Sequence, residues 1–474
     1  MTAQRIGFIL GLTAFALTLV LTPPAGMPPQ AWIVAGLVVW MAAWWMTEAI
    51  PLTATALLPF IVLPFAGVMT ARETASAYYA PILFLILGGA FIALAIERTG
   101  LHRRLSLAIL KAVGSGSGTR HGSAKLLLAF MISAAVLSML ISNTSTSLIM
   151  MPMALAVLAG GGVLADDRDG LAGALPMGIA FAATIGGLGT IVGSPTNGIA
   201  VALLSSMIGV QISFAEWALY GVPIVMTGIP VAAFIIAKVQ RVSAHPFDAA
   251  AARASIGSQR AWTAPEKRLV PLVAITFALW MATPLLKPYL PDGSLTDGTI
   301  AVAAGLLLFM LPDGTGRKLL NWAEADRAPW GVIMMFGGGL ALAAGMSASG
   351  LAQWLGDALL PLAAVPLIIT ALALAAMVIV ITEFASNVAT ASAIIPVVAS
   401  LTVAMGVDPV LLAMPAALAS SWGFMLPAGT GPNAIAWSTG HIALQRMVSA
   451  GLVLDCIGVF MIVGIVWGMA ALIG

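Results

Sequence analysis

Charged residues are scarce in this sequence. Asp, Glu, Lys and Arg make up 8% of the 474 residues, whereas 61% of the residues are apolar. A soluble domain carries about 25% charged residues, so the composition excludes a water-exposed surface around the whole chain. It predicts an all-α polytopic membrane protein embedded in a lipid bilayer. A formal net charge of +2 provides no field for binding nucleic acid.

Metal ligands and nucleophile–base pairs are also scarce. The single cysteine, Cys456, excludes a disulfide framework and a cysteine-based metal site. The four histidines are scattered in loops or at predicted helix ends. None lies beside the serine clusters described below, which argues against an intramembrane enzyme. The sequence therefore favours a function other than catalysis.

Long apolar runs are abundant and predict the membrane spans. A helix needs about 20 residues to cross the hydrocarbon core. The run from Ile6 to Leu21 has no small-x-small cleavage site after it, so we interpret it as the first span rather than a removed signal. The expected spans are 6–21, 31–46, 52–68, 82–97, 173–193, 214–238, 269–286, 298–312, 330–349, 410–427 and 447–472.

Two further apolar stretches, about 125–163 and 365–405, are roughly twice the length of one span. Each has a polar cluster in its middle, Ser142 to Ser147 in the first and Ser386-Asn387 in the second. Non-helical backbone at membrane depth requires burial in protein or a watery cavity. We therefore predict two re-entrant helical hairpins whose polar tips lie at mid-depth.

The positions of the basic residues predict the orientation. With the N-terminus in the cytoplasm and eleven crossings, all of the 20 Lys and Arg residues except Arg72 and Lys287 fall on the cytoplasmic side. The one long polar connection, residues 240–268, then becomes a cytoplasmic linker between the halves 1–239 and 269–474.

The two halves share three sequence blocks in the same order. The segment beginning at Ser142-Asn143 aligns with that at Ser386-Asn387, Thr99-Gly100-Leu101 aligns with Ser349-Gly350-Leu351, and 193–200 aligns with 429–436. By the predicted topology the hairpins enter from opposite sides, so the repeats are inverted. Inverted repeats with helices broken near 173–210 and 410–443 are typical of secondary transporters with a site at the midplane.

The polar breaks indicate what such a site binds. Helix N-termini suit anions, while unwound carbonyls, hydroxyls and amides also suit a cation such as sodium. The tips and breaks contain no Lys or Arg, so an anion would be held by dipoles, amides and hydroxyls, with help from bound cations. This pattern predicts co-transport of an anion with cations. An anion channel would need a continuous polar or basic pore, and that pattern is missing.

Ionisable residues in the spans are further candidates. Glu383 precedes the second tip by three residues and either pairs within the protein, stabilises a cation or carries a proton. We expect Asp455 to have a structural partner, with Arg446 about nine residues away. Glu48 is expected to cap or snorkel at the end of the second span, and Glu97 to be interfacial beside Arg98.

Together, the Ser-Asn tips, the paired Gly-to-Asn breaks and the Trp-Trp-x-Thr-Glu-Ala-Ile-Pro segment at 44–51 resemble the divalent anion/sodium symporter family. The resemblance covers nearly the whole chain. It implies an elevator-type transporter of dicarboxylates, citrate or sulfate with two hairpins, and a homodimer in the plasma membrane, in bacteria the inner membrane. Sodium would be the co-transported ion.

The resemblance also implies particular site residues. A first sodium site would use Ser138, Ser142, Asn143 and the carbonyl of Gly193, and a second would use Thr382, Ala385, Asn387 and Gly429. The substrate carboxylates would meet the following residues: Ser142, Asn143, Thr144, Ser194, Pro195, Thr196, Ser386, Asn387, Val388 and Thr430. Val388 departs from the threonine that is frequent in the family motif, and Thr196 and Gly431 replace prolines.

These patterns predict sodium-coupled import of C4-dicarboxylates such as succinate, malate and fumarate. A sodium-independent dicarboxylate exchanger, and a symporter of citrate or sulfate, remain alternatives. Because a dianion carries two negative charges, inward electrogenic symport would need three or more sodium ions.

Overall fold

The computed structural model describes residues 2–114, 122–164, 167–245, 247 and 261–473. These residues form helices joined by loops, with a single isolated bridge between Pro312 and Lys318, which confirms the predicted all-α class. Ten helices within them are long and apolar enough to cross a membrane by length and composition. Arg120, Arg253, Arg260 and the middle of the predicted linker lie outside the described residues.

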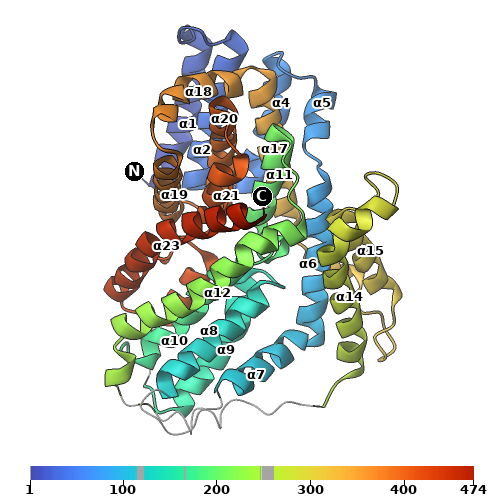
Figure 1. Ribbon diagram of the computed structural model, residues 1–474, viewed down its shortest axis with the longest axis vertical. Helices are drawn as coiled ribbons and strands as arrows, with labels where there is room; N and C mark the ends of the chain where they lie inside the picture. Colours follow the sequence, from blue (N-terminus) through green and yellow to red (C-terminus); the bar gives the residue numbers. More distant parts are fainter. Residues whose placement is uncertain (1, 115–121, 165–166, 246, 248–260, 474) are drawn as a thin grey trace.

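The first half of the chain contains the following elements (Figure 1): α1 (Ala3–Val20), α2 (Pro29–Thr47), α3 (Leu52–Thr55), α4 (Leu58–Phe65), α5 (Ala71–Ala77), α6 (Pro81–Thr99), α7 (Leu101–Gly114), α8 (Gly122–Ser138), α9 (Asn143–Gly160), α10 (Leu171–Gly187), η1 (Ile191–Gly193), α11 (Pro195–Ile208), α12 (Phe214–Val239) and η2 (Val242–Ala244).

The second half contains the following elements: α14 (Ala264–Leu286), η3 (Lys287–Tyr289), α15 (Asp297–Met310), α16 (Trp322–Ala325), α17 (Trp330–Ala348), α18 (Leu351–Leu359), η4 (Leu360–Ala364), α19 (Leu367–Phe384), α20 (Asn387–Met405), α21 (Pro409–Ala419), α22 (Gly431–Ser438) and α23 (Leu444–Ile473).

The span predicted at 52–68 is wrong. Residues 52–68 do not form a continuous helix but the short helices α3 and α4. Proline occupies positions 51, 59 and 64. Pro59 lies in the first turn of α4, where its missing N–H costs no hydrogen bond and its fixed φ favours the start of a new helix. Even the combined stretch, from Leu52 to Phe65, would extend only about 21 Å at 1.5 Å per residue, which is too short to cross about 30 Å of hydrocarbon.

The shared block around Thr99-Gly100-Leu101 corresponds to a bend that occurs in both halves. Gly100 ends α6 with φ of 78°, and Gly350 separates α17 from α18 with φ of 82°. Glycine has no Cβ and adopts this left-handed conformation without strain. In each half the chain therefore turns sharply from a long helix into an amphipathic one.

Helix α10 lies at the centre of the group of helices in the lower part of the molecule. All of its residues are buried, and α8, α9, α12 and α22 pack against it. In Figure 1 the helices α8, α9, α10 and α12 lie together in the lower part, and α12 runs beside α23. On the other side of the molecule α6 packs along α15, which also contacts α14. The first hairpin thus packs on its own half's broken helix, whereas α20 of the second hairpin packs against α11 of the first half as well as against α18 and α21.

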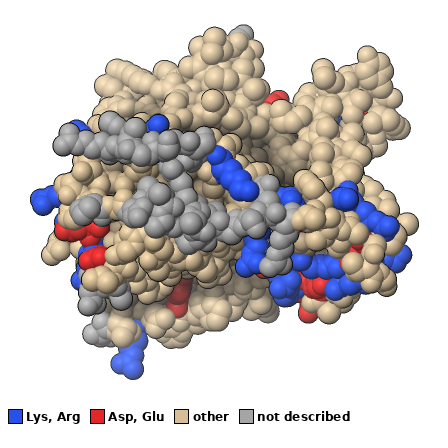
Figure 2. Space-filling view, turned by 90° about the horizontal axis from the view of Figure 1, so that it is seen from below, with Lys and Arg blue, Asp and Glu red and all other residues tan. Residues whose placement is uncertain are grey.

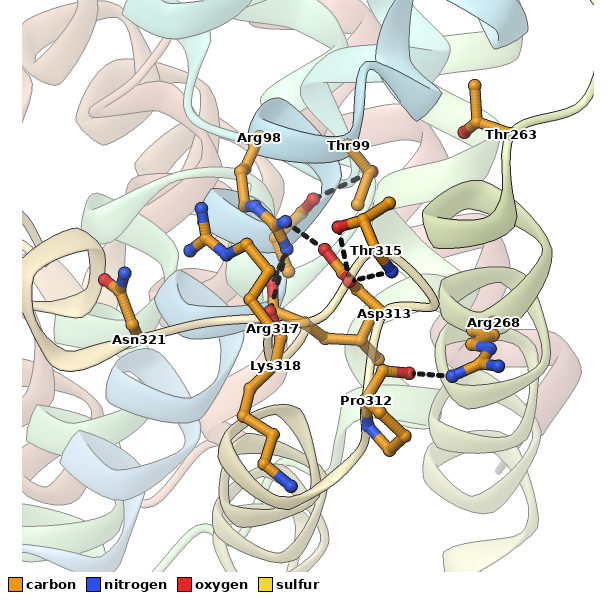
Figure 3. Close-up of polar contacts among 12 residues, drawn as sticks. Arg98, Thr99, Thr263, Arg268, Pro312, Asp313, Thr315, Arg317, Lys318 and Asn321 are labelled. Atoms are coloured by element: carbon orange, nitrogen blue, oxygen red, sulfur yellow. Dashed lines mark hydrogen bonds and ion pairs between the residues drawn. The ribbon is translucent and has the colours of Figure 1, made fainter.

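Basic side chains gather on the lower face of the molecule. Figure 2 shows this face with many Lys and Arg side chains and fewer acidic ones. One of the basic residues, Arg98 at the end of α6, reaches into the loop after α15, where it pairs with Asp313 and donates to Leu319 O (Figure 3). Arg98 therefore forms its ion pair with Asp313 and not with Glu97, its neighbour along the chain.

Asp313 is fully buried in this loop and accepts hydrogen bonds from the backbone N–H of Thr315 at 2.8 Å and from its hydroxyl at 2.7 Å (Figure 3). Burial by itself would raise the pKa of Asp313, but the hydrogen bonds from Arg98 and Thr315 and the positive charge of Arg98 hold the pKa well below its usual value. This ion pair fastens the lower end of α6 to the α15 loop.

Candidate functional site

The two hairpins have short tips. Helix α8 ends at Ser138 and α9 begins at Asn143, so most of the polar run 142–147 lies in the first turns of α9 rather than in a long non-helical tip. Ser142 is the N-cap, and its Oγ accepts from Ser145 N at 3.2 Å. In the second hairpin Ser386 caps α20 in the same way, accepting from Ala389 N at 3.2 Å. Each tip thus presents a capped helix N-terminus, which favours negative charge.

Oxygen atoms converge beside the first tip. Ser138 Oγ lies 2.6 Å from Ala183 O and 2.8 Å from Asn143 Oδ1. The same Asn143 oxygen is 3.0 Å from Gly193 O and 3.3 Å from Ala183 O. We call these four atoms the first oxygen cluster. Because the Ser138 hydroxyl has only one proton to donate, acceptors outnumber donors when the amide oxygen of Asn143 faces the cluster.

Such a cluster suits a hard cation, which binds carbonyl, amide and hydroxyl oxygens. The amide of Asn143 can also satisfy the cluster alone, because an NH2 group at the position of Oδ1 would donate to Ala183 O, Gly193 O and Ser138 Oγ. An asparagine side chain can present either its oxygen or its NH2 group to such a cluster.

The second tip has the same arrangement. Thr382 Oγ1 lies 2.7 Å from Ser420 O and 2.9 Å from Asn387 Oδ1. These three atoms form the second oxygen cluster. In both clusters the hydroxyl residue precedes the asparagine by five positions, and the carbonyl comes from near the end of the following helix, α10 or α21. Ala183 and Ser420 were not among the predicted ligands, because a main-chain carbonyl has no signature in the sequence.

Glycine is required where the first cluster meets α10. A Cβ at Gly187 would lie 2.2 Å from Asn143 Oδ1, and a Cβ at Gly193 would lie 2.6 Å from Gly187 O. A side chain at either position would have to displace the neighbouring oxygen atom. Gly187 was also absent from the prediction, and only the close packing of α10 on the tip reveals its role.

The interruption of the first broken helix, residues 188–194, is braced by two buried side chains. Asn197 Nδ2 donates to Gly187 O at 2.7 Å and to Thr190 O at 2.8 Å, which ties the two ends of the interruption together. Thr190 Oγ1 donates to Met139 O at 2.7 Å and accepts from Gly193 N at 3.0 Å. The position of the Gly193 carbonyl is thereby fixed relative to the tip.

The interruption of the second broken helix, residues 420–430, is braced differently. Asn433 Nδ2 donates to Leu426 O at 3.1 Å, and Thr430 Oγ1 accepts from Asn433 N at 3.1 Å. Glu383 is fully buried, and its two carboxylate oxygens accept from the N–H groups of Met425 and Leu426, each at 2.9 Å. Glu383 thus connects the second hairpin to this interruption.

The two halves meet at Thr144 and Gly431. A Cβ at Gly431 would lie 2.6 Å from Thr144 Oγ1, and α9 packs against α22. The glycine that replaces a proline of the family motif thus gives Thr144 room. Thr144 is exposed, while the neighbouring Thr430 is buried.

A cavity of about 310 Å³ reaches the first tip. Ser142, Ser194 and Pro195 line it together with Glu97 of α6 and Arg327, which precedes α17. The cavity therefore lies between the first hairpin with its broken helix on one side and α6 with the start of α17 on the other. Three of the predicted substrate residues line it, together with one basic side chain.

The remaining predicted residues are distributed as follows. Thr196 is buried within α11, and Val388 packs in α20 against the apolar core. Ala385 is the C-cap of α19. Gly429 lies against Glu383, since its Cβ would be 3.4 Å from Glu383 O. None of these four residues lines the cavity at Ser142.

The expected partner of Asp455 is wrong. Arg446 forms an ion pair with Asp169 and donates to Gln240 Oε1 at 3.1 Å, which fixes the start of α23 to the loop before α10. The residues 446 and 455 lie more than two helical turns apart on α23, too far for contact. Glu48 is the C-cap of α2 in the left-handed conformation, with φ of 49°.

Comparison with known proteins identifies a matching family and similar proteins that are named as transporters. The family model described as the sodium:sulfate symporter transmembrane region matches residues 3–473. A protein of Staphylococcus saprophyticus named sodium-dependent dicarboxylate transporter SdcS is 38% identical over 98% of this chain and 91% of its own length. The protein of the same name from Staphylococcus aureus is 36% identical over the same shares.

A solved structure has the same fold. The crystal structure of the Alcanivorax borkumensis YdaH transporter, described as having an unusual topology, superimposes with a TM-score of 0.58. The match covers 94% of this chain and 98% of that chain at 13% sequence identity. At this identity the likeness concerns the fold alone.

Proposed function

The chain belongs to the sodium:sulfate symporter family, and we propose that it imports C4-dicarboxylates such as succinate, malate and fumarate by symport with sodium across the plasma membrane. The observation that carries this proposal is the pair of oxygen clusters at the hairpin tips. Each offers a hydroxyl, an asparagine amide and a main-chain carbonyl at hydrogen-bonding distances. Relatives that are 36 to 38% identical carry the name sodium-dependent dicarboxylate transporter.

In this proposal the two asparagines couple the cations to the substrate. When sodium occupies a cluster, Oδ1 of Asn143 or Asn387 points at the ion, and the NH2 group of the same amide is turned away from the cluster. It can then donate to a substrate carboxylate at the tip, together with the N–H groups of the helix N-terminus. Without sodium the NH2 group turns into the cluster, and the substrate loses a donor. Ser142, Thr144, Ser194, Pro195, Thr196, Ser386, Val388 and Thr430 complete the proposed substrate site.

The charges agree with this arrangement. The described tips and interruptions contain no basic side chain, so two bound sodium ions would supply the positive charge that a dianion needs at membrane depth. Ser142, Gly193, Ala385 and Gly429 remain proposed ligands beside the atoms of the two clusters.

We further propose that the cavity at Ser142 is the cytoplasmic approach to the site. Arg327 lies at this cavity, and the lower face of the molecule is rich in Lys and Arg (Figure 2), as expected for a cytoplasmic surface. The N-terminus is proposed to be cytoplasmic from the distribution of Lys and Arg along the sequence, and the state described would be open to the inside. The hairpins and broken helices would move as one unit against α6, α14, α15 and α17 in an elevator motion, within a homodimer.

Uptake into proteoliposomes tests the function. Purified protein is reconstituted, and labelled succinate uptake is measured with and without an inward sodium gradient, into empty vesicles and into vesicles preloaded with succinate. Sodium-driven accumulation in empty vesicles is expected. Uptake that needs internal succinate and ignores sodium would replace the symporter with an exchanger. Inhibition by excess sulfate or citrate that exceeds inhibition by malate or fumarate would change the proposed substrate.

A further inference from the structure

The cavity of about 310 Å³ at the first tip receives the N-termini of three helices. Ser142 is the N-cap of α9, Ser194 of α11 and Pro329 of α17, and all three residues line the cavity. A helix N-terminus carries a partial positive charge and N–H groups without partners inside the helix. Helices α9 and α11 reach the cavity from the hairpin side, whereas α17 reaches it from the opposite wall. The cavity therefore attracts anions from two sides.

Arg327 adds a full positive charge to the wall formed by α17. Its side chain is exposed and lines the cavity. Within the described part of the chain its one hydrogen bond runs from Nε to Glu324 O at 3.4 Å, and its guanidinium forms no ion pair. Both terminal NH2 groups of Arg327 are thus available to an anion that enters the cavity.

The other charges of the loop before α17 neutralise each other. Glu324 pairs with Arg317 at 2.7 Å and with Arg98 at 3.5 Å. Asp313 pairs with Arg98 as well (Figure 3). The acidic residues Asp313 and Glu324 therefore have their own basic partners, and the charge of Arg327 is left to the cavity.

Glu97, near the end of α6, is the acidic side chain that lines the cavity. It is half-buried, and among the described residues its carboxylate has no ion-pair partner, Arg327 included. Asp326 precedes Arg327 in the chain but does not line the cavity. Glu97 repels an anion from the α6 wall and Arg327 attracts it towards α17. The two side chains therefore act with opposite sign on the same anion.

We propose that this cavity is a capture site for dicarboxylates on the cytoplasmic side, in which Arg327 binds one carboxylate of the substrate. The planar guanidinium matches a carboxylate through two parallel N–H donors. Ser142 belongs both to the cavity and to the proposed substrate site at the tip. A captured dianion thus lies next to the place from which it leaves or which it enters.

This inference rests on the proposed function and adds a residue to it that affects one face of the membrane. Arg327 precedes α17, which stays in place while the hairpins and broken helices move in the proposed elevator motion. The capture site is therefore assembled in the inward-open state alone. Loss of Arg327 should weaken the interaction with substrate on the cytoplasmic face and leave the outer face unchanged.

The test uses inside-out and right-side-out membrane vesicles from cells that produce the protein, with uptake by vesicles from cells without it subtracted. Initial uptake of labelled succinate is measured against succinate concentration, with saturating sodium outside the vesicles. The variants are Arg327→Gln, Arg327→Lys and Glu97→Gln. Arg103→Gln is the matched control, because Arg103 is exposed on α7 and does not line the cavity.

In inside-out vesicles Arg327→Gln should raise the succinate KM about two- to fivefold, the range of an exposed ion pair. Glu97→Gln should lower this KM, Arg327→Lys should lie between Arg327→Gln and the wild type, and Arg103→Gln should match the wild type. Added choline chloride should shrink these differences because salt screens exposed charges. In right-side-out vesicles all variants should have the wild-type KM.

An unchanged KM of Arg327→Gln in inside-out vesicles would overturn the capture site. An equal rise on both faces would also overturn it, because a merely structural role of Arg327 has no sidedness, and a rise confined to right-side-out vesicles would place the cavity on the other face. If Arg327→Gln does not fold, Glu97→Gln decides, since an unchanged cytoplasmic KM in that variant contradicts the proposal. Failure of the proposed function is distinct, because the wild type would then show no sodium-dependent succinate uptake in either kind of vesicle.

Discussion

Substitution of Gly187 by alanine should weaken sodium activation of transport through a single steric contact. A Cβ at this position would lie 2.2 Å from Asn143 Oδ1, whereas carbon atoms in contact prefer about 3.5 Å or more. The amide of Asn143 must therefore move by about 1 Å, or α10 must separate from the tip. The backbone conformation does not disfavour the substitution, because Gly187 is the last residue of a regular helix, where alanine is favourable.

The magnitude follows from the cost of such overpacking. Added methylene-sized groups in a packed interior cost about 1–3 kcal/mol. If this cost falls on the cation-binding geometry, the sodium concentration for half-maximal succinate uptake rises about 5- to 150-fold. The dependence on succinate at saturating sodium should change much less, because the second tip and the capped helix N-termini are unaffected.

The assay is the sodium dependence of initial succinate uptake in proteoliposomes. Gly464→Ala is the matched control, because a Cβ at Gly464 on α23 meets no atom within 4 Å. Equal thermal unfolding of both variants in detergent would show that the fold is intact. A Gly187→Ala protein that folds normally and is half-activated at the wild-type sodium concentration would refute the role of the first oxygen cluster.

Three further outcomes are expected. Gly431→Ala places a Cβ 2.6 Å from Thr144 Oγ1 and should raise the succinate KM several-fold at saturating sodium; an unchanged KM would exclude Thr144 from the substrate site. Thr382→Ala removes the hydroxyl of the second cluster and should lower the Hill coefficient for sodium by about one, while Thr382→Ser should restore it; equal loss in both variants would contradict a ligand role. Asp313→Asn should cost about 1.5–3 kcal/mol of stability at neutral pH, the usual contribution of a hydrogen bond to a charged group. The pKa of Asp313 is lowered in the folded protein, so the greater stability of the wild type should be present above about pH 4 and should shrink as the pH falls further. Thermal unfolding of both proteins across pH measures this difference. A stability difference that does not depend on pH would refute the ion-pair explanation.

The sequence by itself determined the class of protein and the places where its helices are interrupted. Apolar runs of membrane length can be buried only in lipid or protein, so they predict spans without any knowledge of packing. Asn143 and Asn387 stood out because an amide in hydrocarbon is costly and here occurs at equivalent positions. The prediction over 52–68 was wrong because it followed apolar content alone and gave no weight to Pro59, which lies in the first turn of a new helix, α4.

Only the tertiary structure decided which atoms surround each asparagine. The carbonyls of Ala183 and Ser420 come from other helices, and every residue has a carbonyl, so its sequence does not mark it as a ligand. The same holds for Gly187 and Gly431, whose missing side chains matter only where another element comes within contact distance.

The acidic residues show the same division. The sequence identified Glu383 and Asp455 as buried charges in spans but paired Asp455 with Arg446 on the basis of proximity along the chain. In the folded protein Arg446 belongs to Asp169, and Asp455 faces Glu383. Electrostatic partners are set by distance in space, and an interior of low dielectric makes that distance decisive. Composition could place these charges in the membrane, but only the packing of α23 against residues 420–430 brought them together.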